Sequence, residues 1–295
     1  MTRIAVLANT KKVGQKDLKG LKAALRGAGF EHTQWITFDK GSAATKAGAS
    51  AVKNGADVVV ACGGDGTVRA AAQALVGTEC ALGVMPKGTA NLFASAMSIT
   101  DDPDELVDLI LRGTRRTIDT GTCNGMTFNV MAGTGFDAAM IDDADEHKER
   151  LGVLAYLRSG AKEARAREAF EMTVRVDDES VFEGSASCVL VGNIGTLKGG
   201  VEAFPNASPT DGKLDVAVIT ATGLRAWTGL MVSAVRGRQN LSGHAHLWSG
   251  KTISVHAQAK HRFELDGGVK GTSKKFDFEV VPASLIVCAP QQSAA

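Results

Sequence analysis

Two short glycine-rich turns carry the residue types that could act on phosphate. The first turn, residues 63–67 (Gly-Gly-Asp-Gly-Thr), follows the apolar run 58–61 and precedes a helical pattern. Its glycines let the backbone approach a ligand closely, and the start of the next helix offers unpaired N–H groups to an anion. The carboxylate of Asp65 would repel bound phosphates unless it acts through a magnesium ion or orients a hydroxyl. The turn therefore indicates metal-assisted phosphate chemistry, although a strand-to-helix turn with a capping Asp would give the same segment.

The second turn, residues 86–91 (Pro-Lys-Gly-Thr-Ala-Asn), follows another apolar run over 81–85. Ligands of parallel sheets bind at the carboxyl ends of the strands, so both turns are expected to face one pocket. Thr89 and Asn91 offer a hydroxyl and an amide that could hold phosphate oxygens or a ribose. Taken alone, this segment is equally well explained as a capped helix start.

The elements that must position these turns alternate between strands and helices. The apolar run 4–8 indicates a buried strand, and residues 18–25 then carry leucines at helical spacing. Residues 102–105 (Asp-Pro-Asp-Glu) combine a capping Asp, a Pro at the first helical position and a Glu three residues after the cap, which predicts a helix over 106–112. Together these units predict a parallel sheet flanked by helices.

From about residue 121 the pattern changes to short stretches in which apolar and polar residues alternate. Such alternation, joined by short turns, is typical of an antiparallel sheet. We therefore predict an α/β domain over 1–120 and a β-rich domain over 121–295, and leave open a return of the last residues to the first domain. The predicted elements are a hairpin of 172–176 and 181–184 with its turn at 177–180, further strands near 253–255, 263–265 and 276–280, and helical segments over 145–169 and 224–235.

The composition narrows the class of protein. A chain of 295 residues with 44% hydrophobic and 22% charged residues is typical of a folded protein with two domains that share a cleft. Lys plus Arg number 33 against 32 for Asp plus Glu, so there is no bulk positive field for nucleic acid. The five cysteines are widely spaced, which fits a reducing cytoplasm. The sequence shows neither a signal peptide nor an apolar run of about 20 residues, so we expect any membrane contact to be peripheral.

The two turns together resemble the diacylglycerol kinase catalytic-domain family, which includes bacterial soluble lipid kinases, sphingosine kinases and ceramide kinases. The resemblance continues over residues 130–137, 191–193 and 204–215 and ends at 265–267 (Leu-Asp-Gly). It implies a magnesium-dependent kinase that transfers phosphate from ATP to a lipid hydroxyl, with diacylglycerol as the default acceptor. It also implies a nucleotide-binding α/β domain and an antiparallel β-sandwich domain, in the manner of NAD kinases and diacylglycerol kinases, with the active site between them.

The resemblance assigns roles to individual positions. It implies that Asp65 is central to catalysis and that a structural magnesium ion is held by the Asp211 carboxylate with the backbone carbonyls of Ser208 and Lys213. The implied ATP contacts are Asn9, Gly14, Thr37, Gly63, Gly64, Asp65, Gly66, Thr67, Gly88, Thr89 and Asn91.

Three positions depart from the family pattern. The loop at 9–14 keeps the family's Asn at Asn9 but has Thr10 in place of the usual Pro, and Leu92 replaces an Asp that commonly follows the second turn. The family's Leu-Asp-Gly-Glu ends here in Gly268, so the Glu assigned as base toward the acceptor hydroxyl is missing. Asp266 is the candidate replacement: it could accept that proton, or it could cap the turn.

Other functions remain open at this stage. NAD kinases and phosphofructokinases share the Gly-Gly-Asp-Gly-Thr turn, so a soluble acceptor is the first alternative. A nucleotide-binding pseudokinase is the second, on the grounds of Leu92 and Gly268. The expected partner is a lipid at a membrane surface, which the basic stretch 147–167 or the apolar stripe 224–231 could help to reach, although core packing explains the stripe better. A homodimer also stays open.

Overall fold

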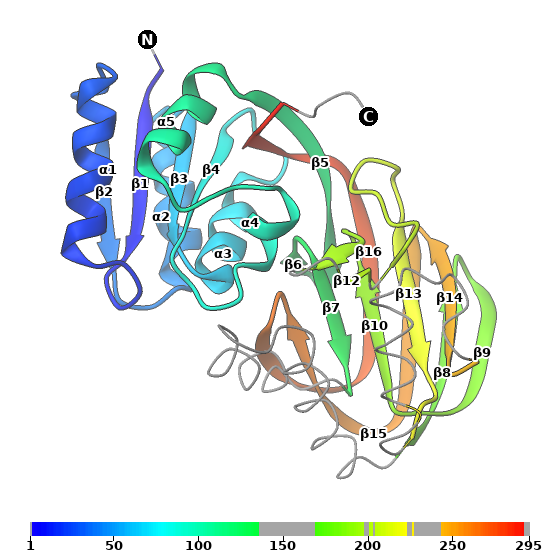
Figure 1. Cartoon of the computed structure of the whole chain (residues 1–295). Helices are drawn as coiled ribbons and strands as arrows, with labels where there is room; N and C mark the ends of the chain where they lie inside the picture. The colour runs from blue at the N-terminus through cyan, green and yellow to red at the C-terminus, as the bar shows by residue number, and fades with distance from the viewer. Residues whose placement is uncertain are drawn as a thin grey trace. The chain divides into compact units, whose positions relative to one another are not determined.

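The computed structural model describes residues 2–135, 169–197, 201–202, 204–222, 226 and 243–291. The chain forms two compact units, Met1–Thr120 with Ala283–Ala295, and Gly121–Pro282 (Figure 1). Both of the helical segments predicted over 145–169 and 224–235 lie outside the described residues, apart from Ala169 and Ala226. Among the helices that are described, none is long and apolar enough to cross a membrane.

The first unit contains a parallel sheet with the strand order β2, β1, β3, β4, β16. All residues of its strands β1, β3 and β4 are buried, as expected for strands covered on both faces. The strands are β1 Ile4–Asn9, β2 Gln34–Phe38, β3 Val58–Gly63, β4 Ala81–Pro86 and the last residues of β16 Gly268–Ala289.

Helices cover both faces of this sheet (Figure 1). α1 (Gln15–Gly27) and α5 (Pro103–Arg112) share one apolar core, in which Leu21 of α1 and Ile110 of α5 join alternate residues of β1 and β3. α2 (Ala43–Lys53) packs against α3 (Asp65–Leu75). The short helix α4 (Leu92–Ala96) follows the second glycine turn. This arrangement confirms the predicted α/β fold class.

The predicted start signal of α5 is also confirmed. The side chain of Asp102 accepts the backbone N–H groups of Asp104 at 2.7 Å and Glu105 at 3.2 Å, with Pro103 at the first helical position. A capping carboxylate satisfies N–H groups that have no partner inside the helix.

The second unit is an antiparallel β-sandwich whose two sheets share the long strand β15 (Thr252–Leu265). The first part of β15 pairs with β8 and its last residues pair with β7, and the register of its pairing with β16 shifts between His256 and His261. One sheet is therefore β14, β13, β10, β7 and β15, and the other is β9, β8, β15, β16 and β5 with β6. The bounds are β5 Thr114–Cys123, β6 Met126–Phe128, β7 Met131–Thr134, β8 Phe170–Val176, β9 Glu179–Ala186, β10 Cys188–Gly192, β13 Leu214–Ile219 and β14 Ala245–Gly250, with a small separate pair of β11 Thr196–Leu197 and β12 Val201–Glu202.

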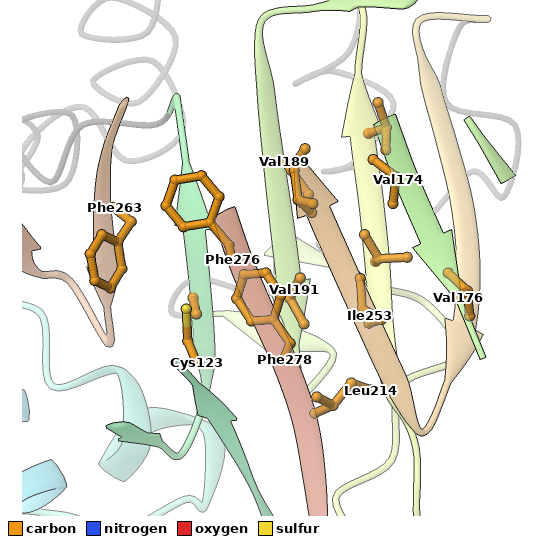
Figure 2. Packing of buried hydrophobic residues seen from close by; sticks show 14 of the residues in the cluster. Cys123, Val174, Val176, Val189, Val191, Leu214, Ile253, Phe263, Phe276 and Phe278 are labelled. Carbon is orange, nitrogen blue, oxygen red and sulfur yellow. The ribbon is translucent and has the colours of Figure 1, made fainter. Parts of the chain in front are cut away.

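The core of the sandwich is formed by the alternate, inward-facing residues of these strands (Figure 2). Phe263 of β15 and Phe276 of β16 pack edge to face with ring centroids 5.6 Å apart. Val174, Val191 and Leu214 are fully buried in the same cluster. The period of two in the sequence thus predicted the correct class of sheet.

The turn of the β8–β9 hairpin is shorter than predicted. Only Asp177 and Asp178 lie between the strands, with φ of 46° and 68°, and β9 begins at Glu179 rather than at Val181. Two consecutive left-handed residues match the twist of the flanking strands, and Asp tolerates this conformation better than most residues. The polar residues Glu179 and Ser180 therefore belong to the strand.

Candidate functional site

The two glycine turns lie side by side in the first unit, at the carboxyl ends of the paired strands β3 and β4. The backbone N–H of Lys87 donates to the carbonyl of Gly63 at 2.8 Å. A Cβ atom added to Gly88 would lie 2.5 Å from the Cα atom of Gly64, so the two backbones are too close for any side chain there. Gly64 and Gly88 are thus required by the contact between the turns themselves.

Asp65 connects the two turns. It is the first residue of α3, and its Oδ1 atom accepts the backbone N–H of Phe93, in α4, at 3.3 Å. The neighbouring Gly66 is exposed, whereas Asp65 is only half-buried. The carboxylate therefore lies at the start of a helix whose N–H groups attract anions, and it also fixes the helix that follows the second turn.

Asn9 and Thr67 link the first strand to the first turn. The Asn9 Nδ2 atom donates to the Thr67 hydroxyl at 3.3 Å, and both side chains are buried. A Cβ atom on Gly63 would meet that hydroxyl at 2.6 Å. The family resemblance assigned all three to ATP, and the structure places them together at the base of the turn rather than at its exposed tip.

Gly14 and Thr37 occupy the neighbouring strand ends. Gly14 caps α1, and its N–H donates to the Asp17 carboxylate at 3.1 Å. Thr37 of β2 pairs with Ala8 of β1 and is exposed. Both residues therefore follow or flank the carboxyl end of β1, the edge at which the two glycine turns also lie.

The second turn is closed by its own asparagine. Asn91 has a left-handed backbone with φ of 47°; its Oδ1 atom accepts the N–H of Gly88 at 2.8 Å, and its Nδ2 atom donates to the Gly88 carbonyl at 3.0 Å. Thr89, between them, is exposed. Leu92 is 2% exposed and packs into the fold, which explains how an apolar residue is accommodated where the family commonly has Asp.

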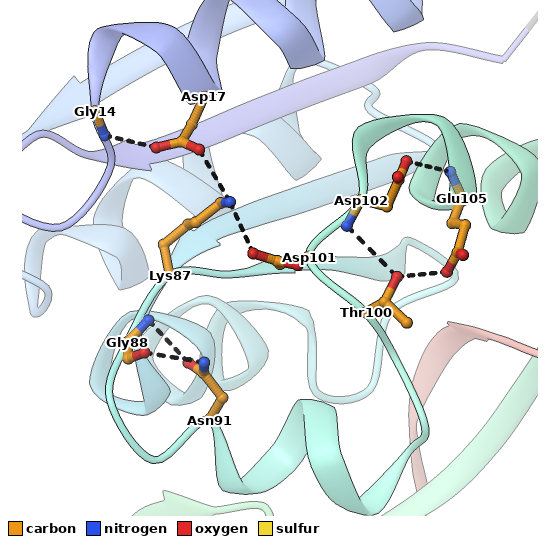
Figure 3. A network of polar contacts seen from close by, with 9 residues as sticks. All are labelled: Gly14, Asp17, Lys87, Gly88, Asn91, Thr100, Asp101, Asp102 and Glu105. Atoms are coloured by element: carbon orange, nitrogen blue, oxygen red, sulfur yellow. Dashed lines mark hydrogen bonds and ion pairs between the residues drawn. The ribbon is translucent and has the colours of Figure 1, made fainter. Parts of the chain in front are cut away.

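Lys87 forms ion pairs that were not foreseen from the sequence (Figure 3). Its Nζ atom lies 3.0 Å from the Asp17 carboxylate of α1 and 3.1 Å from the Asp101 carboxylate ahead of α5. Partial burial lowers the pKa of Lys87, but the hydrogen bonds and charges of the two aspartates outweigh it and raise that pKa overall. The sequence contained one sign that Asp17 has a structural role: it lies three residues after the helix cap Gly14, which is the spacing of a capping box.

Asp266 lies in the second unit and is turned into the protein. It is 4% exposed, and its carboxylate accepts the backbone N–H groups of Asn129, Val130 and Met131 at 2.9, 2.8 and 3.1 Å. With Gly267 it forms the two-residue turn between β15 and β16, at φ of 47° and 74°. Because three backbone N–H groups already occupy the carboxylate, this geometry favours the capping interpretation over the base.

The three predicted magnesium ligands occupy one turn ahead of β13. The N–H of Asp211 donates to the Ser208 carbonyl at 3.4 Å, and the Asp211 Oδ1 atom accepts the N–H of Lys213 at 3.0 Å. One carboxylate with carbonyl and water oxygens fits the preference of magnesium. Burial first, and the charge of Asp211 second, raise the pKa of the neighbouring Asp215 to about 6, while the charge of Lys213 opposes them.

Side chains alone do not make this metal site. Among the residues that the structure describes, no group of three or more His, Cys, Asp or Glu side chains could hold a metal ion. The predicted site would depend on backbone carbonyls and on the single carboxylate of Asp211, and magnesium there stays a prediction.

The fold and the paired glycine turns define a class of protein: two-domain kinases with an α/β domain and a β-sandwich domain. Residues 3–123 match the diacylglycerol kinase catalytic domain, and residues 130–289 match the YegS C-terminal NAD kinase beta sandwich-like domain. The chain belongs to this diacylglycerol kinase-like family of lipid kinases.

Named relatives cover most of the chain. It is 31% identical to a probable lipid kinase YegS-like of Pseudomonas aeruginosa, over 99% of this chain and 95% of that protein. It is 28% identical to a diacylglycerol kinase of Staphylococcus saprophyticus, over 88% of this chain and 86% of that one. An uncharacterized Synechocystis protein is 32% identical over 81% of this chain, which spans 56% of the length of that relative.

Two solved structures share the fold. A putative diacylglycerol kinase from Bacillus anthracis superposes with a TM-score of 0.79 at 23% identity, over 98% of both chains. An NAD kinase from Archaeoglobus fulgidus in complex with ATP superposes with a TM-score of 0.56 at 14% identity, over 98% of this chain and 94% of that one. At these sequence identities the structural similarity supports the fold and no more.

Proposed function

We propose that this chain transfers the γ-phosphate of ATP to a lipid hydroxyl. The observation that carries the proposal is the pair of glycine turns held in backbone contact at the ends of β3 and β4. The exposed residues of these turns are Gly66 and Thr89, beside the N-terminus of α3. Backbone N–H groups and a hydroxyl at a helix start are suited to phosphate oxygens.

In this proposal the chain acts mainly by positioning. Phosphoryl transfer needs little covalent chemistry from the protein, because most of the catalysis is alignment and charge neutralisation. The first turn holds the phosphates on its N–H groups, and Asp65 would act on them through a magnesium ion while its Oδ1 atom accepts the N–H of Phe93. Magnesium, when bound with ATP, supplies the positive charge that neutralises the phosphates.

Diacylglycerol is the acceptor that we propose first. Relatives from Staphylococcus saprophyticus and Bacillus subtilis are named diacylglycerol kinases, and others are named probable lipid kinases. A reducing cytoplasm suits the five free cysteines, all of which are buried. We place the enzyme there, at the membrane surface that holds its acceptor.

An exposed basic face on α1 supports contact with such a surface. It lies opposite the buried Leu21 and Leu25, and basic residues on one face of a helix are attracted to anionic lipid. Sedimentation with phosphatidylglycerol vesicles tests this contact: it should decrease with added salt, and binding that ignores lipid charge would contradict it. The exposed cations are Lys16, Lys19, Lys22 and Arg26.

A second candidate function is nucleotide binding without transfer. It is favoured by Gly268, which stands where the family has a catalytic Glu, and by the three N–H groups that occupy the Asp266 carboxylate. In that case no described carboxylate of the β15–β16 turn would accept the proton of an acceptor hydroxyl.

One experiment separates these functions. The purified protein is incubated with γ-labelled ATP, magnesium and a total lipid extract, beside Asp65→Asn and the control Asp108→Asn, an exposed carboxylate on α5. Asn keeps an oxygen for the Phe93 N–H and removes only the charge of Asp65. We expect label in the organic phase for the wild type and the control, and none for Asp65→Asn. No organic label despite ATP binding would support the second function, or a soluble acceptor if label appears in water-soluble product.

A further inference from the structure

We propose that Lys87 is a positioning residue for nucleotide binding, which ties the second glycine turn to α1 and to the segment before α5 instead of contacting phosphates itself. The proposal rests on the proposed function, because it assumes that ATP binds at the two turns. A lysine in a glycine turn would ordinarily be taken for a phosphate ligand. Two ion pairs of Lys87, shown in Figure 3, and one backbone hydrogen bond argue otherwise.

The Lys87 side chain is held between two aspartates. The Lys87 ammonium is bound on two sides, by Asp17 at 3.0 Å and by Asp101 at 3.1 Å, and the side chain is only 15% exposed. The backbone N–H of the same residue donates to the Gly63 carbonyl of the first turn. One residue therefore connects both turns to two separate segments of the first unit.

Asp17 uses its two carboxylate oxygens to hold two different segments. One carboxylate oxygen of Asp17 accepts the N–H of Gly14, which ends the loop after β1, and the other binds Lys87. The loop at 9–14 and the second turn are thus held by a single carboxylate. Asn91 fixes Gly88 within the second turn, and Asp65 of the first turn fixes Phe93 just after it, so Lys87 completes the attachment at the start of the second turn.

The two roles predict opposite effects when a neighbouring negative charge is removed. If Lys87 contacts phosphates, Asp17→Asn removes a competitor and an anion from the vicinity, and ATP should bind more tightly. If Lys87 positions the turn, the same change loosens it, and ATP should bind more weakly. Asn still offers an oxygen to the N–H of Gly14, so only the ion pair is lost.

The test is equilibrium ATP binding by calorimetry for the wild type, Lys87→Met, Lys87→Arg, Asp17→Asn and the double variant Lys87→Met with Asp17→Asn. Lys53→Met, an exposed lysine at the end of α2, is the control. We expect about tenfold weaker binding for Lys87→Met, about fivefold for Asp17→Asn, and no further loss in the double variant, because coupled residues are not additive. Arg, which can bridge two carboxylates, should restore most of the affinity.

Kinetics provide a readout that a merely structural loss would not change. A less stable protein has fewer active molecules and a lower kcat, whereas a displaced turn raises both the Kd and the KM for ATP. Tighter or unchanged ATP binding by Asp17→Asn would overturn the positioning role. If the wild type itself binds no ATP, the proposed function fails; if it binds and the variants match it, only this inference fails.

Discussion

Two aspartates, one in each unit, stand next to glycines in a turn motif but lie in different environments. Asp65, in Gly-Gly-Asp-Gly, begins a helix, is half-buried and accepts the N–H of Phe93. Asp266, in Leu-Asp-Gly-Gly, lies in a hairpin turn, is almost fully buried and accepts three backbone N–H groups. A carboxylate beside glycine is therefore available for chemistry only where the surrounding backbone leaves it partly exposed.

Removing the Asp266 carboxylate should have the largest effect, and it should act on the stability of the protein. Asp266→Ala leaves three buried N–H groups without their charged acceptor, so we expect the free energy of unfolding to fall by about 4 kcal/mol. Urea denaturation measures it. The matched control is Asp178→Ala, at an exposed left-handed turn position of the β8–β9 hairpin, which should cost less than about 1 kcal/mol. A variant that is as stable as the wild type but inactive would return Asp266 to the role of base.

The next effect breaks the contact between the two glycine turns. In Gly88→Ala the new Cβ atom would lie 2.5 Å from the Gly64 Cα atom, and backbone must move to admit it. Because a displacement of about 1 Å can cost about 10²-fold in rate, we expect kcat/KM for ATP to fall by that factor, with weaker ATP binding as part of the loss. Gly27→Ala, where the added Cβ meets nothing within 4 Å, is the control. ATP titration followed by calorimetry would contradict the account if both variants bind like the wild type.

Replacing Gly268 by Glu tests whether the chain lacks a catalytic base. Gly268→Glu restores the family's carboxylate next to the Asp266 turn, and the nearest atom to its Cβ is the flexible Lys270 Nζ at 3.3 Å. Since phosphoryl transfer depends mostly on alignment, we expect kcat to rise about tenfold, less than general bases contribute elsewhere. Gly268→Gln controls for side-chain size. An equal rise in Gln, or none in Glu, would show that no base is missing.

The smallest effect is a pH dependence of the Asp17–Lys87 pair. The hydrogen bond from Lys87, opposed by partial burial, lowers the pKa of Asp17 below its ordinary 3.8. The stabilising contribution is therefore present above 3.8 and is lost as pH falls through the lower folded value. Because the carboxylate is partly exposed, we expect less than about 1 kcal/mol. Carboxyl NMR titration should show the Asp17 pKa rising in Lys87→Met, and an unchanged pKa would contradict the pairing.

Patterns of local sequence predicted the framework well, because local physics determines it. The continuous apolar runs at β1, β3 and β4 indicate burial on both faces, and Asp102 with Pro103 and Glu105 forms a local start signal for a helix. Alternation likewise predicted the antiparallel sandwich. The β8–β9 turn was placed too wide because polar strand residues on an exposed face look like turn residues.

The contacts of the site were harder to predict because they join distant residues. Asp266 binds N–H groups up to 137 residues away, and Lys87 meets Asp17 only because α1 and the second turn share one end of the sheet. No local pattern indicates such a pair. Asn91 and Thr67 illustrate the same limit: their residue types suit a phosphate, yet hydrogen bonds within the fold already engage them.

Hydrogen exchange with and without ATP would show where ATP binds, since it reports on the amides of both glycine turns and of the Asp266 loop in one experiment. Bound phosphates should protect the amides of residues 63–69 and 87–93, and leave those of 126–131 and 263–268 unchanged. Protection confined to 126–131 and 263–268, or none anywhere while ATP is bound, would contradict the assignment of ATP to the glycine turns and of Asp266 to the fold.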